Sequence, residues 1–172
     1  MKGRAQRFGD NVDTDAIIPG EFCHLTKIEE VGAHAFHHVR PEFGARVREG
    51  RTIVVGGEGW GSGSSREHAA WALIGAGVKA VIAKSYAFIH KRNLVNEALP
   101  YLIVQDAAFY ELAQEDSELE IDLAAGEVKH LASGRSFKAV RPSPIVQALQ
   151  REGGLVPAVR RHGTNVFEAL SA

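Results

Sequence analysis

A glycine-rich loop between a short apolar segment and a helical segment constrains this chain more than any other feature. Five glycines fall between Gly56 and Gly63, after an apolar run at 52–55 that predicts a buried strand. Residues 65–76 follow the loop and predict a helix. A strand, a glycine loop and a helix N-terminus in succession favour an anion, because unpaired N–H groups and the helix dipole attract negative charge. Arg66 adds a planar guanidinium suited to a carboxylate or a phosphate.

The composition is that of an ordinary globular domain. The chain has 172 residues, 45% of them hydrophobic and 24% charged, and its formal net charge of −1 gives no electrostatic case for nucleic acid. No apolar run approaches the roughly 20 residues of a membrane helix, and the N-terminus lacks an apolar signal segment. The single cysteine, Cys23, fits a reducing cytoplasm. We therefore expect one cytoplasmic domain over residues 1–172, with neither nucleic acid nor membrane as partner.

Alternating strand and helix patterns predict an α/β fold. The expected strands cover residues 1–8, 52–56, 79–83, 101–104, 119–123, 127–132 and 135–140. The expected helices cover residues 28–38, 65–76, 86–97 and 145–151, with a shorter one after Pro157, and residues 9–20 are expected to be a loop. The order predicts a mixed, largely parallel sheet flanked by helices, with a C-terminal antiparallel meander.

Common nucleotide and hydrolase motifs do not fit the glycine loop. It lacks the Gly-Lys-Ser/Thr of a Walker loop, the third glycine of a dinucleotide fingerprint and the spacing of a Gly-x-Ser-x-Gly elbow. A structural interpretation remains open, in which Ser64 and Glu67 form a capping box for the following helix. His68 has a structural alternative as well, packing against the next strand.

Three long segments carry a resemblance to a known family. They are the aspartate-rich segment Gly9–Gly20, the Ser-Ser-Arg-Glu segment Gly61–Ala69, and the strand and helix of Lys79–Asn93. Together they resemble the aconitase superfamily, and specifically the small subunits of 3-isopropylmalate dehydratase or of homoaconitase. The resemblance covers nearly the whole chain and implies a swivelling β/β/α domain.

The resemblance also implies a partner and a cofactor. The complete enzyme of this family pairs such a chain with a larger subunit that carries a 4Fe-4S cluster, as a heterodimer or a dimer of heterodimers. A cluster needs several cysteine ligands and this chain has one, so Cys23 is expected to be a loop or core residue and no metal is expected here. The chain alone is expected to be colourless and inactive, and its small-molecule partner a hydroxy di- or tricarboxylate.

Matching the family motif assigns roles to four residues. Ser64 is expected to be the base, acting as an alkoxide that the loop amides, the helix N-terminus and Arg66 stabilise. Ser65 and Arg66 are expected to hold the substrate carboxylate, and Asp15 to orient the catalytic groups in the same pocket. Asp10 and Asp13 are expected to be turn or cap residues.

Residues 20–28, here called the specificity loop, leave the substrate open. The family often has a Tyr-Leu pair and a basic residue there, whereas this chain has His24 in place of the tyrosine. Leu25 favours a branched apolar substituent, as in isopropylmalate, and Lys27 favours a further carboxylate, as in homocitrate or homoaconitate. Both residues occur in one loop, so the sequence does not separate the leucine pathway from the lysine pathway.

Several other features admit more than one interpretation. His34, His37 and His38 have a spacing that metals can use on a helix, but no further ligand completes a site, which favours a partly exposed face or a subunit contact. Lys91 and Arg92 fit either a solvated face or an edge that binds the partner. Besides a hydro-lyase subunit, two functions remain: a non-catalytic anion- or nucleotide-binding module, and a protein-interaction domain whose glycine loop is structural.

Overall fold

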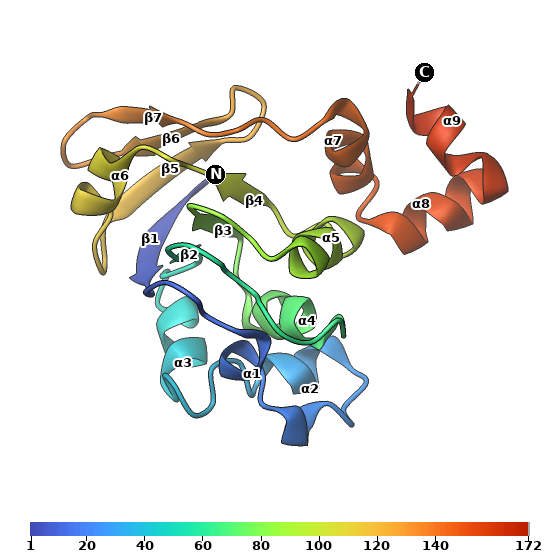
Figure 1. Ribbon diagram of the computed structural model, residues 1–172, viewed down its shortest axis with the longest axis horizontal. Helices are drawn as coiled ribbons and strands as arrows, with labels where there is room; N and C mark the ends of the chain where they lie inside the picture. Colours follow the sequence, from blue (N-terminus) through green and yellow to red (C-terminus); the bar gives the residue numbers. More distant parts are fainter. Residues whose placement is uncertain (172) are drawn as a thin grey trace.

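A seven-stranded mixed sheet forms the centre of the computed structural model, which describes residues 1–171. The strand order is β4-β3-β2-β1-β5-β6-β7 (Figure 1). The strands are β1 (Lys2–Arg7), β2 (Ile53–Val55), β3 (Ala80–Ala83), β4 (Tyr101–Ile103), β5 (Glu118–Asp122), β6 (Glu127–His130) and β7 (Ser136–Lys138). Neighbouring strands from β1 to β4 pair in parallel, and β1, β5, β6 and β7 pair antiparallel. The predicted parallel core and antiparallel meander are both confirmed.

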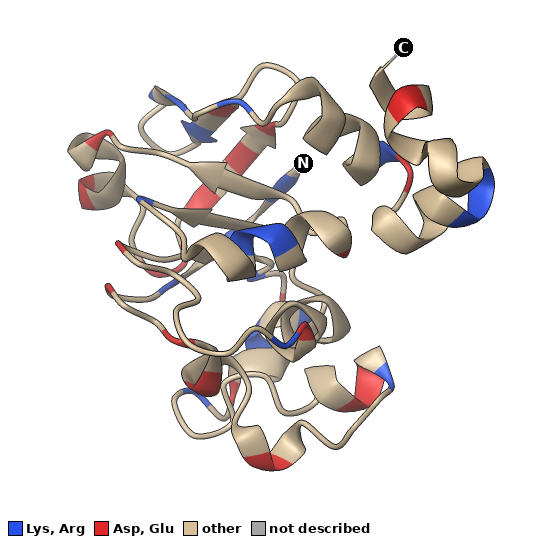
Figure 2. Cartoon of the chain, turned by 45° about the vertical axis from the view of Figure 1, so that its right-hand side comes forward, with Lys and Arg blue, Asp and Glu red and all other residues tan. Residues whose placement is uncertain are grey.

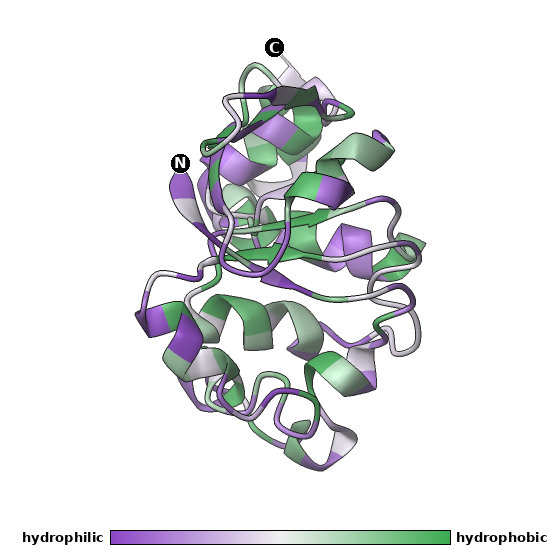
Figure 3. Cartoon of the chain, turned by 90° about the vertical axis from the view of Figure 1, so that its left-hand side faces the viewer, coloured by the Kyte–Doolittle hydropathy of each residue, from purple (hydrophilic) through white to green (hydrophobic). Residues whose placement is uncertain are grey.

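The burial of each strand follows from its sequence. All side chains of β2 and β3 are buried, as expected for short apolar strands that are covered on both faces. The strand β5 instead alternates exposed and buried side chains, with Leu119 and Ile121 turned inward. In Figure 3 the strands at the centre of the sheet are predominantly hydrophobic, while β1 is more hydrophilic.

Nine α-helices and two short 3-10 helices, η1 (Gly20–Phe22) and η2 (Gly163–Asn165), accompany the sheet within residues 1–171. The α-helices are α1 (Thr14–Ile17), α2 (Ile28–Gly32), α3 (Phe43–Arg48), α4 (His68–Ala76), α5 (Phe88–Asn96), α6 (Ala107–Leu112), α7 (Pro144–Arg151), α8 (Leu155–His162) and α9 (Val166–Ser171). One core cluster joins residues of α1 to α5 to one face of the parallel strands, and a second lies between the other face, α6 and the meander. None of these helices is both long and apolar enough to cross a bilayer.

Several predicted helix boundaries are wrong. The helix expected at 28–38 ends at Gly32 and turns continue beyond it, because Phe36 adopts a left-handed conformation, with φ of 55°, and donates its N–H to Ile17 O. The loop expected at 9–20 contains α1, and α3, α6 and α9 were not predicted. Pro157 lies inside the first turn of α8 rather than before it, where a missing N–H costs no helical bond.

The C-terminal helices form a small core of their own. Leu149 of α7, Ala158 of α8 and Val166 of α9 pack together, separately from the two clusters around the sheet. Figure 1 shows α8 and α9 at the side of the molecule, beyond α7 and away from the loops that follow β1 and β2. These helices therefore contribute little to the region described next.

Candidate active site

Two loops that follow neighbouring parallel strands lie side by side and bond to each other. The loop after β1 and the glycine loop after β2 are joined by Gly61 N–H to Val12 O (2.7 Å) and by Thr14 N–H to Ser62 O (2.8 Å). Because parallel strands end at the same edge of a sheet, ligand sites often form there. The aspartate-rich segment and the serine-rich segment, far apart in sequence, thus become one surface.

Residues 64–66 are here called the serine turn, and the first of them is hydrogen-bonded to a side chain of the loop after β1. The N–H of Ser64 donates to Thr14 Oγ1 at 2.8 Å, and Thr14 is buried. The half-buried Ser64 hydroxyl accepts from the N–H of Arg66 at 3.2 Å. The Ser64 hydroxyl oxygen therefore already receives one backbone donor of the kind that stabilises negative charge.

The capping-box interpretation of Ser64 and Glu67 is wrong. The helix α4 begins at His68, three residues later than predicted, so its N-cap is Glu67, whose side chain makes no capping bond. Ser64 thus lies four residues before the helix rather than at its cap. Its hydroxyl remains free of the helix.

The loop amides contribute less to an anion site than the sequence predicts. Gly57 and Gly61 donate to the loop after β1, and Gly59 donates to Ser85 Oγ, so these N–H groups are already used. Nearer the helix, the amides of Ser65, Glu67 and His68 have no acceptor within residues 1–171. The free donors that favour an anion therefore belong to the serine turn and the start of α4.

One small depression is lined by charged and nucleophilic residues of both loops. Its lining consists of Thr14, Asp15, Ile18, Cys23, Ser64, Arg66, His68 and Ala69. The side chains of Asp15 and Arg66 are exposed, and within the described part of the chain neither is paired in a salt bridge. The structure thus brings Asp15, Ser64 and Arg66 to one depression, while Ser65 is exposed outside this lining.

The other aspartates of the first loop have structural roles. Asp13 caps α1 by accepting the N–H of Ala16 at 2.7 Å, and Asp10 accepts the N–H of Glu58 at 2.8 Å. Both contacts agree with the turn and cap roles predicted for them. Asp15 has no such bond, which leaves its carboxylate available within residues 1–171.

The specificity loop is attached to the start of α4. His68 Nε2 lies 3.1 Å from the carbonyl oxygen of Leu25, a contact that the sequence did not predict. The Leu25 side chain is half-buried, whereas Lys27 is 73% exposed and pairs with Glu30 at 2.9 Å. His24 points its Nδ1 to its own loop, 2.7 Å from Glu21 O. Neither Leu25 nor Lys27 lines the depression.

The three histidines expected on one helix lie on turns after α2. His34 stacks on Phe22 of the specificity loop with ring centroids 3.9 Å apart, and exposed His38 pairs with Glu21 at 3.2 Å. In the part of the chain that the structure describes, no group of three His, Cys, Asp or Glu side chains is placed to hold a metal ion. These histidines pack against the specificity loop instead.

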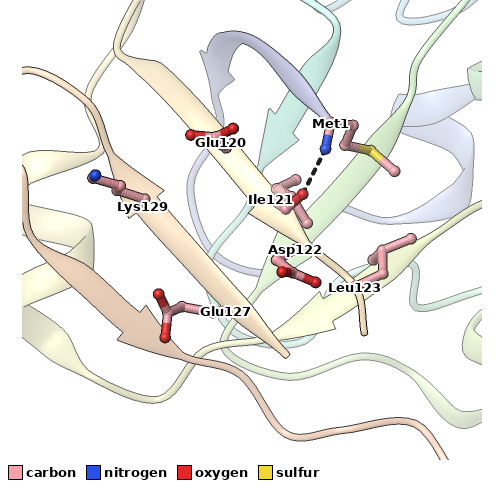
Figure 4. Close-up of a pocket in the computed structure, with 7 residues that line it drawn as sticks. All are labelled: Met1, Glu120, Ile121, Asp122, Leu123, Glu127 and Lys129. Atoms are coloured by element: carbon pink, nitrogen blue, oxygen red, sulfur yellow. Dashed lines mark hydrogen bonds between the residues drawn. The ribbon is translucent and has the colours of Figure 1, made fainter. Parts of the chain in front are cut away.

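Two larger hollows lie elsewhere on the surface, one on the meander and one between α5 and the C-terminal helices, and neither is lined by the two loops. Figure 2 shows basic and acidic residues scattered over the elements, with Lys91 and Arg92 on α5. The shallow hollow on the meander is lined by Glu120, Asp122, Glu127 and Lys129, and the amino group of Met1 donates to Ile121 O there at 2.6 Å (Figure 4). It contains no residue of either loop, so the depression beside Ser64 is the better candidate.

Sequence reasoning missed several residues at the candidate site. Thr14 was not singled out, although it lies inside a segment that carried the resemblance, and the contact of His68 with Leu25 was not predicted. Asn93 of α5 was missed as well, although it donates to the serine turn. Cys23 lines the depression, consistent with its predicted place in a loop.

This combination of a mixed sheet, a glycine loop and a Ser-Ser-Arg turn defines an aconitase-type domain. Residues 42–106 match the model of the aconitase C-terminal domain. The crystal structure of 3-isopropylmalate dehydratase from Methanocaldococcus jannaschii superposes with a TM-score of 0.86 at 36% identity, covering 99% of this chain and 98% of that one. The fold expected from the resemblance is therefore confirmed.

Relatives define the family more narrowly. The 3-isopropylmalate dehydratase small subunit of Methanosarcina acetivorans is 40% identical over 161 residues, which cover 94% of this chain and 97% of the relative. The methanogen homoaconitase small subunit of Methanothermobacter thermautotrophicus is 40% identical over 156 residues, 91% of this chain and 88% of the relative. The chain belongs to the aconitase-superfamily family of small subunits that includes those of 3-isopropylmalate dehydratase and homoaconitase.

Proposed function

We propose that this chain is the small subunit of a hydro-lyase that isomerises 2-isopropylmalate to 3-isopropylmalate by dehydration and rehydration. One observation carries the proposal: the Ser64 hydroxyl, the Arg66 guanidinium and the Asp15 carboxylate line a single depression. The names of two similar proteins, at 36% and 40% identity over nearly the whole chain, support the reaction type. The activity belongs to leucine biosynthesis in the cytoplasm, and the chain acts as one swivel domain.

Four residues at or beside the depression divide the chemistry between them. Isomerisation needs a base for a C–H proton next to a carboxylate. Ser64 is the base: its alkoxide takes that proton and becomes the hydroxyl, and returns the proton to the neighbouring carbon on rehydration. Arg66 and Ser65 bind the substrate carboxylate, which places the C–H bond beside Ser64. Asp15 orients these groups from the loop after β1.

The remaining chemistry is assigned to a large subunit. A cluster needs several cysteine ligands and the sequence has one cysteine, so we assign the cluster to the large subunit. A 4Fe-4S cluster on the large subunit supplies the Lewis acid for the departing hydroxyl. The exposure of Asp15, Ser65 and Arg66 leaves room for that partner to close the site.

Two substrates are compatible with the specificity loop, and the names of the similar proteins favour one of them. Lys27 extends into solvent and pairs with Glu30, and Leu25 packs against the core cluster, so neither side chain lines the depression. We prefer 2-isopropylmalate because two of the three similar proteins named above are 3-isopropylmalate dehydratases. Homocitrate and homoaconitate remain the alternative substrates, since a relative named as a homoaconitase is equally 40% identical.

The test is activity of the chain assembled with its cognate large subunit. We expect Ser64→Ala to lower kcat at least about 100-fold, as removal of an essential proton acceptor does, while the complex still forms. Ser62→Ala, an exposed serine of the same loop, is the matched control and should retain activity. Turnover of 2-isopropylmalate must exceed that of homocitrate.

Other outcomes of these assays support the competing functions. Full activity in Ser64→Ala contradicts the proposed base. Tight binding of ATP or NAD by the isolated chain, without turnover in the assembled complex, supports an anion-binding module instead. A complex that turns over normally in both Ser64→Ala and Arg66→Ala supports a purely structural glycine loop.

A further inference from the structure

The serine turn rests on α5 through one buried side chain. Asn93 is 6% exposed, and its Nδ2 amino group lies 3.1 Å from the carbonyl oxygen of Ser65 and 3.1 Å from that of Arg66. An amide amino group has two hydrogens, so these two carbonyls use both of them. Removing a donor from such a buried position leaves acceptors unpaired, which is costly.

The peptide group between Ser65 and Arg66 connects Asn93 to the Ser64 hydroxyl. Its carbonyl accepts from Asn93 at 3.1 Å, and its N–H, on Arg66, donates to Ser64 Oγ at 3.2 Å. A trans peptide is planar and its C=O and N–H point in opposite directions. Fixing the carbonyl toward α5 therefore directs the N–H toward Ser64 Oγ.

The same arrangement strengthens the donor as well as aiming it. A carbonyl that accepts a hydrogen bond polarises its peptide, and bonds in such a chain reinforce one another. Here the chain runs from Asn93 through the Ser65–Arg66 peptide to Ser64. The effect is largest when the last acceptor carries negative charge, because charge-assisted hydrogen bonds are about twice as strong as neutral ones.

We propose that Asn93 is a positioning residue for Ser64, acting through the Ser65–Arg66 peptide to orient the N–H that stabilises the Ser64 alkoxide. The inference rests on the proposed role of Ser64 as the base. Asn96, on the same helix, provides a matched control: its Nδ2 lies 3.5 Å from Glu67 Oε1 and contacts no carbonyl of the serine turn.

The first experiment measures kinetics in the complex with the cognate large subunit. We expect Asn93→Ala to lower kcat about 10- to 100-fold, less than the loss of a direct oxyanion donor, with KM changed by less than about threefold. The pH at which kcat rises should move upward by about one unit, a tenfold weaker acid. Asn93→Asp keeps the side-chain size but loses both donors, and should behave similarly. Asn96→Ala should leave kcat and the pH profile unchanged.

The second experiment is independent of activity and uses the chain alone. In NMR spectra, we expect the Arg66 amide proton to move upfield in Asn93→Ala and not in Asn96→Ala. In the wild-type chain, the Nδ2 hydrogens of Asn93 should exchange with solvent more slowly than those of Asn96. This last comparison tests the contact even if both Asn93 variants fail to fold.

Failure of this inference differs from failure of the proposed function. If Ser64→Ala is inactive but folded Asn93 variants keep wild-type kcat and an unshifted Arg66 amide, Asn93 has no positioning role. Equal exchange of the Asn93 and Asn96 side-chain hydrogens contradicts it too. If Ser64→Ala is fully active, the base assignment fails, and with it any catalytic role of Asn93.

Discussion

His90 is a buried histidine whose two ring nitrogens have no hydrogen-bond partner within residues 1–171. It is 1% exposed, lies on the same helix as Asn93, and packs against Gly61 of the glycine loop. Burial lowers the pKa of His90 from 6.5 to about 4, because the surroundings disfavour the charged imidazolium. The neutral ring therefore fills space beneath the loop and does not exchange protons at neutral pH.

This lowered pKa predicts a pH-dependent stability. Between pH 6.5 and about 4 the unfolded chain binds a proton at His90 that the folded chain does not, so the free energy of unfolding falls as the pH falls. The loss approaches about 3 kcal/mol across that window, at about 1.4 kcal/mol per pH unit. Urea unfolding at pH 7 and pH 4.5 should show a smaller loss in His90→Leu than in the wild type. The control His37→Leu, at an exposed position, should keep the wild-type loss. Equal losses in wild type and His90→Leu contradict the prediction.

Gly61 makes the close approach between His90 and the loop possible. Its φ is 79°, and a Cβ there would lie 2.2 Å from His90 Cδ2. Gly134 has a similar φ of 68°, and a Cβ at that position would meet nothing within 4 Å, so Gly134 isolates the backbone cost.

We expect Gly134→Ala to cost about 1 kcal/mol of stability, the cost of a left-handed alanine. Gly61→Ala should cost about 3 kcal/mol or more, since it adds overpacking to the same backbone strain. The difference between their urea midpoints, at equal m values, measures the packing contribution. Similar midpoints for the two variants would show that the loop relaxes away from α5 freely.

Strands and helices with strong periodicity were predictable, and contacts between distant loops were not. The apolar runs of β2 and β3 predict buried strands, and the alternation of polar and apolar residues in β5 predicts which of its faces is exposed to solvent. The helix expected at 28–38 was extended too far because a tertiary bond, from Phe36 N–H to Ile17 O, overrides local propensity. Local pattern cannot reveal such a bond.

The candidate site shows the same division. Asp15, Ser64 and Arg66 were assigned by motif, and the structure places them around one depression. The capping box failed because Ser64 bonds to the opposite loop, through Thr14, fifty residues earlier in the sequence. Asn93 was missed because a buried asparagine has no distinctive spacing. Motifs therefore located the reactive groups, whereas their supports required the three-dimensional contacts.

The molecule divides into a continuous core around the sheet and a small C-terminal appendage. The parallel strands are buried between two large clusters, whereas α8 and α9 pack mainly through the cluster of Leu149, Ala158 and Val166. Local opening costs least where few apolar contacts must be broken. We expect residues 155–171 to open without unfolding the sheet.

Amide hydrogen exchange followed by mass spectrometry tests this expectation. The opening free energy of α8 and α9 should be at least about 2 kcal/mol below that of β2 and β3, whose amides exchange only through global unfolding. The antiparallel strand β5, whose side chains are alternately exposed and buried, provides an internal reference for the exchange rates. Protection in α8 and α9 equal to that of β2 would mean that the whole chain unfolds as one cooperative unit.

The backbone hydrogen bonds between the loops after β1 and β2 hold these two loops in a fixed relative position. Because the loops after β1 and β2 are joined by backbone hydrogen bonds, we expect the Asp15 carboxylate and the Ser64 hydroxyl to move as one rigid unit. Under the proposed function, a movement of the whole chain relative to a large subunit would leave the spacing of these two groups unchanged. Insertion of a single residue into either loop would shift Asp15 relative to Ser64 and lower activity, even if the rest of the molecule folded normally.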